Sequence, residues 1–484
     1  MTMAAGPAAA PPARLRSAVQ FALLAGPLLS MLDSSIVNVA AEPIARSLHA
    51  SLATVQWAVS GYLLALGTGL AATSYLARRF GTRAVYRASM IAFTVASGSC
   101  AAATGTAMLL ASRVVQGLVA APLVPLAMSM LLGRGQDQGK PAARSVSALA
   151  GMMLFLGPAL GPTVGGALIG AAGWRWIFLI NVPVGAAAAL ATGRIPAALA
   201  PGRAQATRFD LPGLVLLAAG MALVLLGASQ GAQAGWAVPR TWLPLLGGLA
   251  LLAGYGRWAA GREHPALDLG LARHRGPVLA LALCALASVV TFAAIFLLPV
   301  FVQSVQGRSA LAAGLAMLPQ GVVTGISTAL GQRVLTRVSV RVTVLAGFSI
   351  LTVTSLGLLA IGARTPLAVT AAVLAGRSAS IGLVIAPLLA VLTQPLRPAQ
   401  LGDASTLFSI CQRIAGSFGI GLLAALFAVQ ARAHGPVTAL HVTGGVVAVI
   451  SAAGILAAPL LPATRNVALG AAGPPAGPRQ ATAG

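Results

Sequence analysis

The chain has 484 residues, of which 58% are hydrophobic and only 8% are charged, and its mean hydropathy is +0.90. Because soluble domains carry about 25% charged residues, this composition excludes a soluble protein and indicates an integral membrane protein. In a soluble chain the net charge of +24 would suggest nucleic-acid binding. Here it follows from the short cytoplasmic loops of a many-span protein, in which basic residues set the topology.

Fourteen stretches are long and apolar enough to cross a bilayer, which takes about 20 residues. They fall near 18–40, 53–73, 84–104, 107–131, 145–170, 174–193, 211–231, 242–260, 276–305, 311–333, 342–362, 367–392, 404–430 and 438–461. The first apolar run continues into a full span, which favours an uncleaved helix over the alternative of a cleavable signal peptide. We therefore expect an all-α membrane fold.

The basic residues orient these spans. With the N-terminus in the cytoplasm, 22 of the 31 Lys and Arg residues fall in cytoplasmic segments and six in external ones, and the even number of spans then puts both termini in the cytoplasm. The remaining three, Arg113, Arg377 and Arg413, lie inside predicted spans. Such a charge costs about 2.5–3.5 kcal/mol at a helix centre, which makes it a functional candidate. The alternative is an arginine that snorkels or bonds to backbone carbonyls.

Other site chemistries find little support in the sequence. Cys100, Cys284 and Cys411 lie in apolar surroundings without a C-x-x-C pair or a histidine cluster, which argues against a metal site or a disulfide framework. The chain also lacks a phosphate-binding G-x-x-x-x-G-K loop. We therefore expect neither an enzyme nor an ATP-driven pump, and no metal.

The two halves of the chain share a weak parallel repeat. The loop Arg79–Arg83 recurs 258 residues later as Arg337–Arg341, and Arg113 is echoed by Arg377. One large class of transporters has such halves and binds substrate at the midplane between two rocking bundles. The predicted domains are a cytoplasmic tail (1–17), a six-helix bundle (18–195), a linker with two additional spans (196–275), a second six-helix bundle (276–462) and a disordered cytoplasmic tail (463–484).

The fifth stretch is dense in glycine and proline. It reads G-P-A-L-G-P-T-V-G-G over 157–166, and the six residues of interest are Gly157, Pro158, Gly161, Pro162, Gly165 and Gly166. Small residues allow close helix approach in a bilayer, and proline breaks intrahelical hydrogen bonds that neighbouring groups must then satisfy. Bending or tight packing is expected here.

This run resembles the antiporter motif of the major facilitator superfamily. Four other segments are similar to those of its fourteen-helix drug:proton antiporters, the EmrB and QacA group: L-D-S-S-I-V-N-V-A at 32–40, R-V-V-Q-G at 113–117, W-R-W-I-F-L-I-N-V-P-V-G at 174–185 and the segment 402–419. The resemblance covers residues 15–465, roughly. It implies the major facilitator fold, two six-helix bundles plus two inserted central helices, and proton-coupled export of drugs or other small amphipathic compounds.

Two departures from the family pattern stand out. The loop after the second span has Arg78, Arg79 and Gly81 where the superfamily pattern includes an acidic residue, which puts in doubt a gating role for a carboxylate there. A similar variant is familiar in the EmrB-like branch. After the first-helix motif, where Leu-Pro is usual, this chain has Glu42 and Pro43.

Asp33 is the only carboxylate predicted well inside a span. At 1.5 Å per residue it lies ~10 Å from the outer end of its helix, and Arg113 lies ~9 Å from the outer end of its own, so the two are roughly level. A low-dielectric site disfavours the charged carboxylate, whereas a nearby cation favours it. Protonation of Asp33 is therefore expected to weaken its attraction to Arg113 and to bias the bundles between inward-open and outward-open states. Asp403 is the next candidate for proton transfer.

Several polar or charged residues are candidates for the substrate cavity by span position and resemblance, with packing as the alternative for each. They are Asn38, Gln56, Trp57, Tyr62, Gln116, Gln303, Arg377 and Arg413. The last two exceed the available intramembrane carboxylates, so if they face the cavity they favour an anionic or zwitterionic compound.

The resemblance implies no cofactor, with the proton gradient as energy source. The expected partners are a small-molecule substrate and the lipid bilayer, not nucleic acid, with a periplasmic adaptor protein if the cell is Gram-negative and a monomer as the working form. The expected location is the bacterial cytoplasmic (inner) membrane. A proton-coupled uptake symporter and a non-transporting receptor or scaffold stay open as alternatives.

The topology can be tested with reporter fusions. Alkaline phosphatase fused after residue 465 should be inactive because that end is predicted to be cytoplasmic, and a fusion in the short loop near Arg364 should be active because that loop is predicted to be external. Activity at the first position or inactivity at the second would overturn the span count or the orientation.

Overall fold

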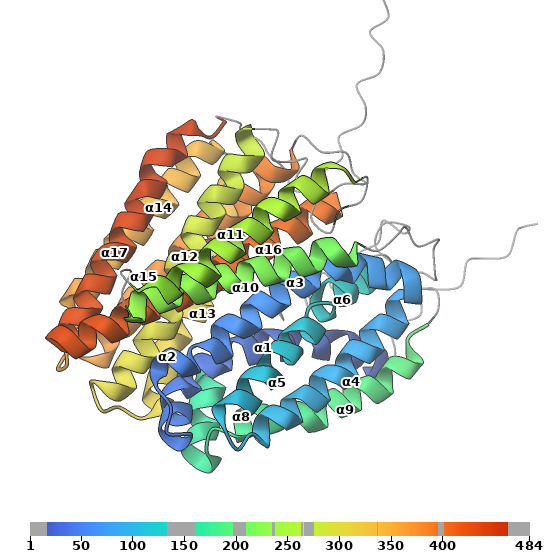
Figure 1. Cartoon of the computed structure of the whole chain (residues 1–484), viewed down its shortest axis with the longest axis horizontal. Coiled ribbons are helices and arrows are strands. Elements are labelled where there is room, and N and C mark those ends of the chain that lie inside the picture. The colour runs from blue at the N-terminus through green and yellow to red at the C-terminus, as the bar shows by residue number, and fades with distance from the viewer. Residues whose placement is uncertain are drawn as a thin grey trace, which may run out of the picture. The chain divides into compact units, whose positions relative to one another are not determined.

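A computed structural model describes residues 17–132, 160–196, 210–234, 238–262, 265, 275–335, 337–394 and 401–462. Every regular element within these ranges is helical (Figure 1). This agrees with the expected all-α class. In a bilayer the backbone has no water to bond with, so a helix that satisfies its own N–H and C=O groups is one of the few structures that can cross.

The described helices belong to two compact units, one of residues 1–218 with 309–315 and one of residues 219–308 with 316–484. Unit 1 contains α1 (Ser17–Ser47), α2 (Leu52–Val55), α3 (Trp57–Phe80), α4 (Thr82–Ala101), α5 (Thr106–Ala120), α6 (Leu123–Leu132), the helix Leu160–Ala172, α8 (Trp176–Leu179) and α9 (Asn181–Ala191). Unit 2 contains α11 (Pro239–Ala260), α12 (Arg275–Ser304), α14 (Val340–Leu356), α15 (Leu367–Thr393), α16 (Leu401–His434) and α17 (Pro436–Ala457). Two helices, α10 (Leu211–Ala234) and α13 (Ala310–Val334), contribute residues to both.

Each of the fourteen predicted stretches overlaps a helix in the described residues. Ten helical segments there are long and apolar enough to cross a membrane, and shorter apolar helices follow at Leu160–Ala172 and Leu211–Gly227. The protein is thus a multi-pass helical membrane protein. The total of fourteen spans stays a prediction.

Three of the predicted spans are interrupted. The stretch 53–73 divides into α2 and α3 at Gln56, and proline explains the other two breaks. The stretch 107–131 divides into α5 and α6 just before Pro122, and the stretch 174–193 divides into α8 and α9 at Ile180. A proline has no N–H for the carbonyl four residues earlier. Pro183 therefore leaves the carbonyl of Leu179 without its helical donor.

The sequence repeat is accompanied by a repeat in packing. In unit 1, a Cβ placed on Gly117 of α5 would overlap the backbone carbonyl of Tyr62 on α3. In unit 2, a Cβ on Gly382 of α15 would overlap the backbone of Ser327 on α13. Because only glycine permits such contact, the helix next to the arginine-bearing helix touches its backbone in each unit.

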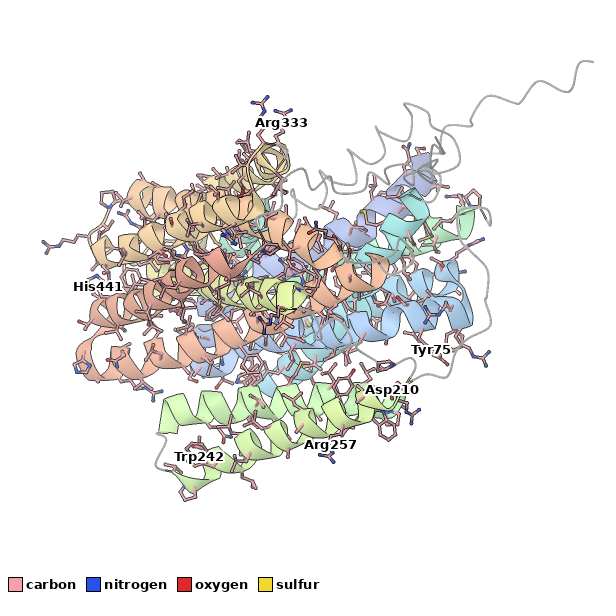
Figure 2. All side chains as sticks on the ribbon, turned by 90° about the horizontal axis from the view of Figure 1, so that it is seen from above. Tyr75, Asp210, Trp242, Arg257, Arg333 and His441 are labelled. Carbon is pink, nitrogen blue, oxygen red and sulfur yellow. The ribbon has the colours of Figure 1, made fainter. Side chains whose placement is uncertain are left out.

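Glycine also joins α10 to α11. Within unit 2, a Cβ on Gly220 would lie 2.9 Å from the side chain of Leu252, and one on Gly248 would lie 2.6 Å from the backbone nitrogen of Val224. The two helices run side by side, with Trp242 near one end of α11 and Arg257 toward the other (Figure 2). This arrangement agrees with the predicted orientation, in which Trp242 lies at the outer membrane interface and Arg257 at the cytoplasmic end of the same span.

Candidate functional site

The centre of unit 1 is an ion pair. Asp33, in the middle of α1, and Arg113, on α5, are both completely buried, and Nη1 of the arginine lies 2.6 Å from Oδ2 of the aspartate. The structure therefore brings together two residues that are 80 positions apart in the sequence. A buried pair of opposite charges is retained only when further hydrogen bonds satisfy the remaining donors and acceptors.

Two amide side chains supply those bonds to the aspartate. Nε2 of Gln116 and Nδ2 of Asn181 each donate to Oδ1 of Asp33, both at 3.2 Å. Gln116 follows Arg113 by three positions on α5, which puts both side chains on one face of the helix. Its Oε1 accepts a 2.7 Å bond from Nη1 of Arg113. The carboxylate thus has donors from two different helices.

The guanidinium is held on its other sides by α3 and α8. Nε of Arg113 donates to the carbonyl of Ala58 at 2.9 Å, and its Cζ lies 4.0 Å from the centre of the Tyr62 ring and 5.6 Å from that of Phe178. A cation over an aromatic face gains about 2 kcal/mol when desolvated. Nη2 has no hydrogen-bond partner among the described residues, so the cation depends strongly on Asp33.

Asn181 is a site residue that the sequence reasoning did not single out. It begins α9, and Nδ2 also approaches Oγ of Ser97 at 3.0 Å, which in turn donates to the carbonyl of Phe178 at 2.9 Å. Both side chains are completely buried. The available signal was the position of an asparagine in the otherwise apolar segment 174–185, because an amide in a span needs a polar partner.

The pair is electrically neutral as a whole, but neither member is neutral alone. Removing one charge from a buried pair leaves the other uncompensated in a low-dielectric environment, which destabilises that arrangement by about 3–5 kcal/mol. A proton on Asp33 would have this effect on Arg113. The site can therefore convert a protonation event into a preference for a different arrangement of α1 and α5.

Of the predicted cavity residues, Tyr62 and Gln116 belong to the ion-pair site and the others do not. Asn38 donates to Ser35 of its own helix, and the buried amide of Gln56 has no hydrogen-bond partner among the described residues. Trp57 is half-buried. In unit 2, Gln303 is buried and donates to Pro299, Arg377 is buried, and Arg413 is half-buried. Asp403 lies in α16, and its side chain is outside the described residues.

The glycine-rich motif lies against two helices. Gly157 and Pro158 fall outside the described residues, whereas Gly161, Pro162, Gly165 and Gly166 lie in the helix Leu160–Ala172. A Cβ on Gly161 or Gly165 would overlap Ser35 or Ile36 of α1, the residues that follow Asp33 and Ser34.

The opposite side of the motif contacts the first turns of α13, which are also part of unit 1. A Cβ on Gly166 would overlap the carbonyl of Ala310, and one on Gly314 would overlap that of Pro162. Oγ1 of Thr163 donates to the carbonyl of Gly314 at 3.0 Å. The motif thus packs against side chains of the helix that carries Asp33 and against the backbone of α13.

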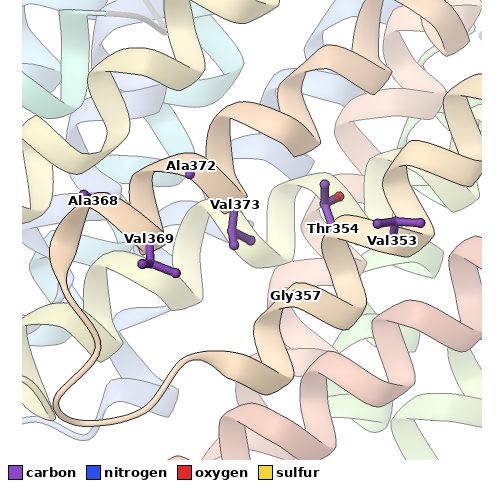
Figure 3. Close-up of a pocket in the computed structure, with 7 residues that line it drawn as sticks. All are labelled: Val353, Thr354, Gly357, Ala368, Val369, Ala372 and Val373. Carbon is purple, nitrogen blue, oxygen red and sulfur yellow. The ribbon is translucent and has the colours of Figure 1, made fainter.

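Unit 2 has an open hollow with an apolar lining, in contrast to the buried polar site of unit 1 (Figure 3). It lies between α14 and α15 and is lined by Val353, Thr354, Gly357, Ala368, Val369, Ala372 and Val373. The hydroxyl of Thr354 bonds to carbonyls of its own helix, and Val353 is 66% exposed. An open apolar surface on a membrane helix suits lipid chains, so we do not assign a substrate to this hollow.

A helical membrane fold with a buried ion pair and close glycine contacts is the architecture of a transporter. The model of the Major Facilitator Superfamily matches residues 23–420, and the chain belongs to that family. The fold is also shared with solved transporters at 14% sequence identity. They include a D-xylose-proton symporter (TM-score 0.64, 92% of this chain and 98% of that one) and the peptide transporter POT (TM-score 0.67, 91% and 94%).

Curated relatives include exporters. The chain is 33% identical over 410 residues to a multidrug resistance protein B homolog of Mycobacterium tuberculosis, covering 83% of this chain and 74% of that protein. It is 34% identical over 309 residues to the multidrug export protein EmrB of Escherichia coli, covering 62% and 58%. The methylenomycin A resistance protein of Streptomyces coelicolor is 30% identical over 410 residues, covering 83% and 84%.

Gly161→Leu should impair transport without preventing membrane insertion, because its side chain would displace α1 at Ser35. Gly170→Leu is the matched control, since it lies in the same helix and a Cβ there meets nothing within 4 Å. Efflux is compared at equal expression. Normal efflux by the Gly161 variant would mean that this contact is not needed.

Asn181→Ala should lower the thermal unfolding midpoint, because a hydrogen bond to a charged group contributes about 1.5–3 kcal/mol. The decrease should be smaller when Asp33 is already Asn, as expected for residues in one network. Asn38→Ala is the control, since this buried asparagine bonds to its own helix and its effect should be additive with that of Asp33→Asn. Additivity of Asn181→Ala would contradict the assigned bond.

Proposed function

We propose that this protein is a proton-coupled secondary exporter of drugs or other small amphipathic compounds, which works by alternating access. The observation that carries the proposal is the buried Asp33–Arg113 pair. An intramembrane ionisable pair is expensive to keep and is typical of proton relays and substrate pathways. The names of the relatives from Mycobacterium tuberculosis and Escherichia coli support the direction and the kind of substrate.

Coupling follows from the electrostatics of the pair. Asp33 takes up a proton from the outer side, and Arg113 then loses its counter-ion and keeps Gln116, the carbonyl of Ala58 and the rings of Tyr62 and Phe178. The resulting penalty shifts the protein to the alternative state, in which the proton leaves to the cytoplasm. Substrate moves outward in exchange, so the proton gradient supplies the energy and no cofactor takes part.

We also propose a cellular location, an oligomeric state and a partner for this protein. The protein lies in the bacterial cytoplasmic membrane with both termini in the cytoplasm and works as a monomer. In a Gram-negative cell a periplasmic adaptor would continue the export path. Efflux and uptake assays in inverted and right-side-out vesicles distinguish this exporter from an uptake symporter of the same fold.

Asp33→Asn should abolish substrate accumulation driven by an imposed pH gradient in proteoliposomes, while substrate binding survives. The amide keeps the size of the carboxyl group and one acceptor oxygen but has neither its charge nor a titratable proton. Asp33→Glu should retain partial activity with a shifted pH dependence. Arg113→Ala should impair coupling in a non-additive way with Asp33→Asn, because the two side chains are in direct contact.

Glu42→Gln is the matched control for this series. Glu42 is a second carboxylate on α1 that also pairs with an arginine, at 2.8 Å from Arg46, but that arginine side chain is 71% exposed. Exposed pairs contribute little, so transport should stay near the wild-type rate. Near wild-type pumping by Asp33→Asn would place proton transfer at another residue. If the wild-type protein transports nothing and Asp33→Asn leaves its cellular function unchanged, a receptor or scaffold is favoured.

A further inference from the structure

Unit 2 contains a buried arginine, Arg377, for which the described residues supply no counter-ion. Arg377 lies on α15 with 4% of its surface exposed, about 15 Å along the helix from Leu367. Nη1 donates to Oγ of Ser355 on α14 at 2.8 Å, and Nη2 donates to the carbonyl of Val290 on α12 at 2.9 Å. Both partners are neutral. Among the residues that the structure describes, ion pairs form at Arg46 and at Arg113 but not here.

The sequence repeat explains what is missing. Arg377 corresponds to Arg113, whose carboxylate partner is Asp33. The offset of 258 residues between the repeated loops places Thr291 at the position equivalent to Asp33, and the offset of 264 between the two arginines places Leu297 there; both residues are uncharged. The guanidinium bonds to the carbonyl of Val290, the residue directly before Thr291. Unit 2 has therefore kept the cation of the pair, while a neutral residue occupies the place of the anion.

A guanidinium has five donors in a planar fork that matches a carboxylate. The hydrogen bonds from Arg377 to Ser355 and Val290 fix two of these donors but do not neutralise the charge. A buried cation without an internal anion is unfavourable in a membrane. An anion that enters from outside the chain would remove this penalty, and it would be held near the middle of the span.

We propose that Arg377 binds the anionic group of the transported compound, and that the substrates are organic anions or zwitterions with an apolar body. The inference rests on the proposed export function for the fate of the bound compound, but binding itself requires no proton coupling. Ser355 positions the guanidinium. Carboxylates and sulfonates on an aromatic frame have the required chemistry.

The test uses three probes of similar size and different charge: 2-naphthoate, 2-naphthamide and 2-naphthylmethylammonium. Binding to the purified full-length protein is followed by the temperature at which a maleimide dye labels the thiols, because Cys100 and Cys284 are buried until the protein unfolds. In the wild type, 2-naphthoate should stabilise the protein more than the amide and the ammonium do. Arg377→Gln should weaken naphthoate binding at least tenfold and leave amide binding unchanged.

Three further variants distinguish anion binding at Arg377 from a general effect of removing an arginine. Arg341→Gln is the matched control, because Arg341 also bonds to a backbone carbonyl within unit 2, that of Leu461, and its loss should not change naphthoate binding. Arg377→Lys keeps the charge and should retain part of the affinity, and Ser355→Ala should weaken it several-fold. These two variants keep the test decisive if Arg377→Gln does not fold.

Asp33→Asn distinguishes this inference from the proposed function. It should lose proton-driven transport but bind 2-naphthoate with wild-type affinity, since Asp33 belongs to unit 1. Two results would overturn the inference: equal wild-type affinity for naphthoate and naphthamide, or unchanged naphthoate affinity in Arg377→Gln. Loss of coupling in Asp33→Asn with either of these results would leave the exporter proposal intact and reject the anion site alone.

Discussion

The low dielectric constant around Asp33 and Arg113 is the constraint on which unit 1 depends. Neither charge is tolerable alone in this environment, so the surrounding helices are arranged to satisfy the pair: α5 supplies Gln116, α9 supplies Asn181, and α3 supplies a carbonyl and an aromatic face. Each contact fixes the position of another helix. A change in the charge of Asp33 is therefore felt by several helices together, which is the property that a proton-coupled conformational change requires.

The two units share a type of helix crossing but differ in the groups that surround the buried arginine. Both pack the arginine-bearing helix against a neighbour through glycine, and both bury the arginine. In the part of the chain that the structure describes, Arg113 has a carboxylate partner, whereas Arg377 bonds to neutral groups. Duplication followed by loss of one carboxylate would give a protein in which one unit responds to protons and the other keeps an unsatisfied charge. Such a division assigns energy input and ligand recognition to separate side chains, so that each can vary without loss of the other.

The helical class and the closeness of Asp33 and Arg113 could be predicted from the sequence, because hydropathy gives the spans and the helical rise gives depth. The rotation of each helix about its axis could not be obtained in this way. For that reason the sequence does not indicate that Tyr62 and Gln116, two cavity candidates, contact the ion pair, nor that Asn181 donates to Asp33. Breaks within spans were missed at Pro122 and Pro183, because hydropathy does not register a lost backbone hydrogen bond.

The break at Ile180 has a mechanical consequence. Pro183 leaves the carbonyl of Leu179 without a helical donor, so the chain can bend there without breaking a further hydrogen bond. Phe178, which lies over Arg113, precedes this point, and Asn181, which holds Asp33, follows it. The two contacts therefore lie on opposite sides of the break at Ile180. Flexing at one residue would change the relative positions of the groups that hold the cation and the anion, while both helical arms stay rigid.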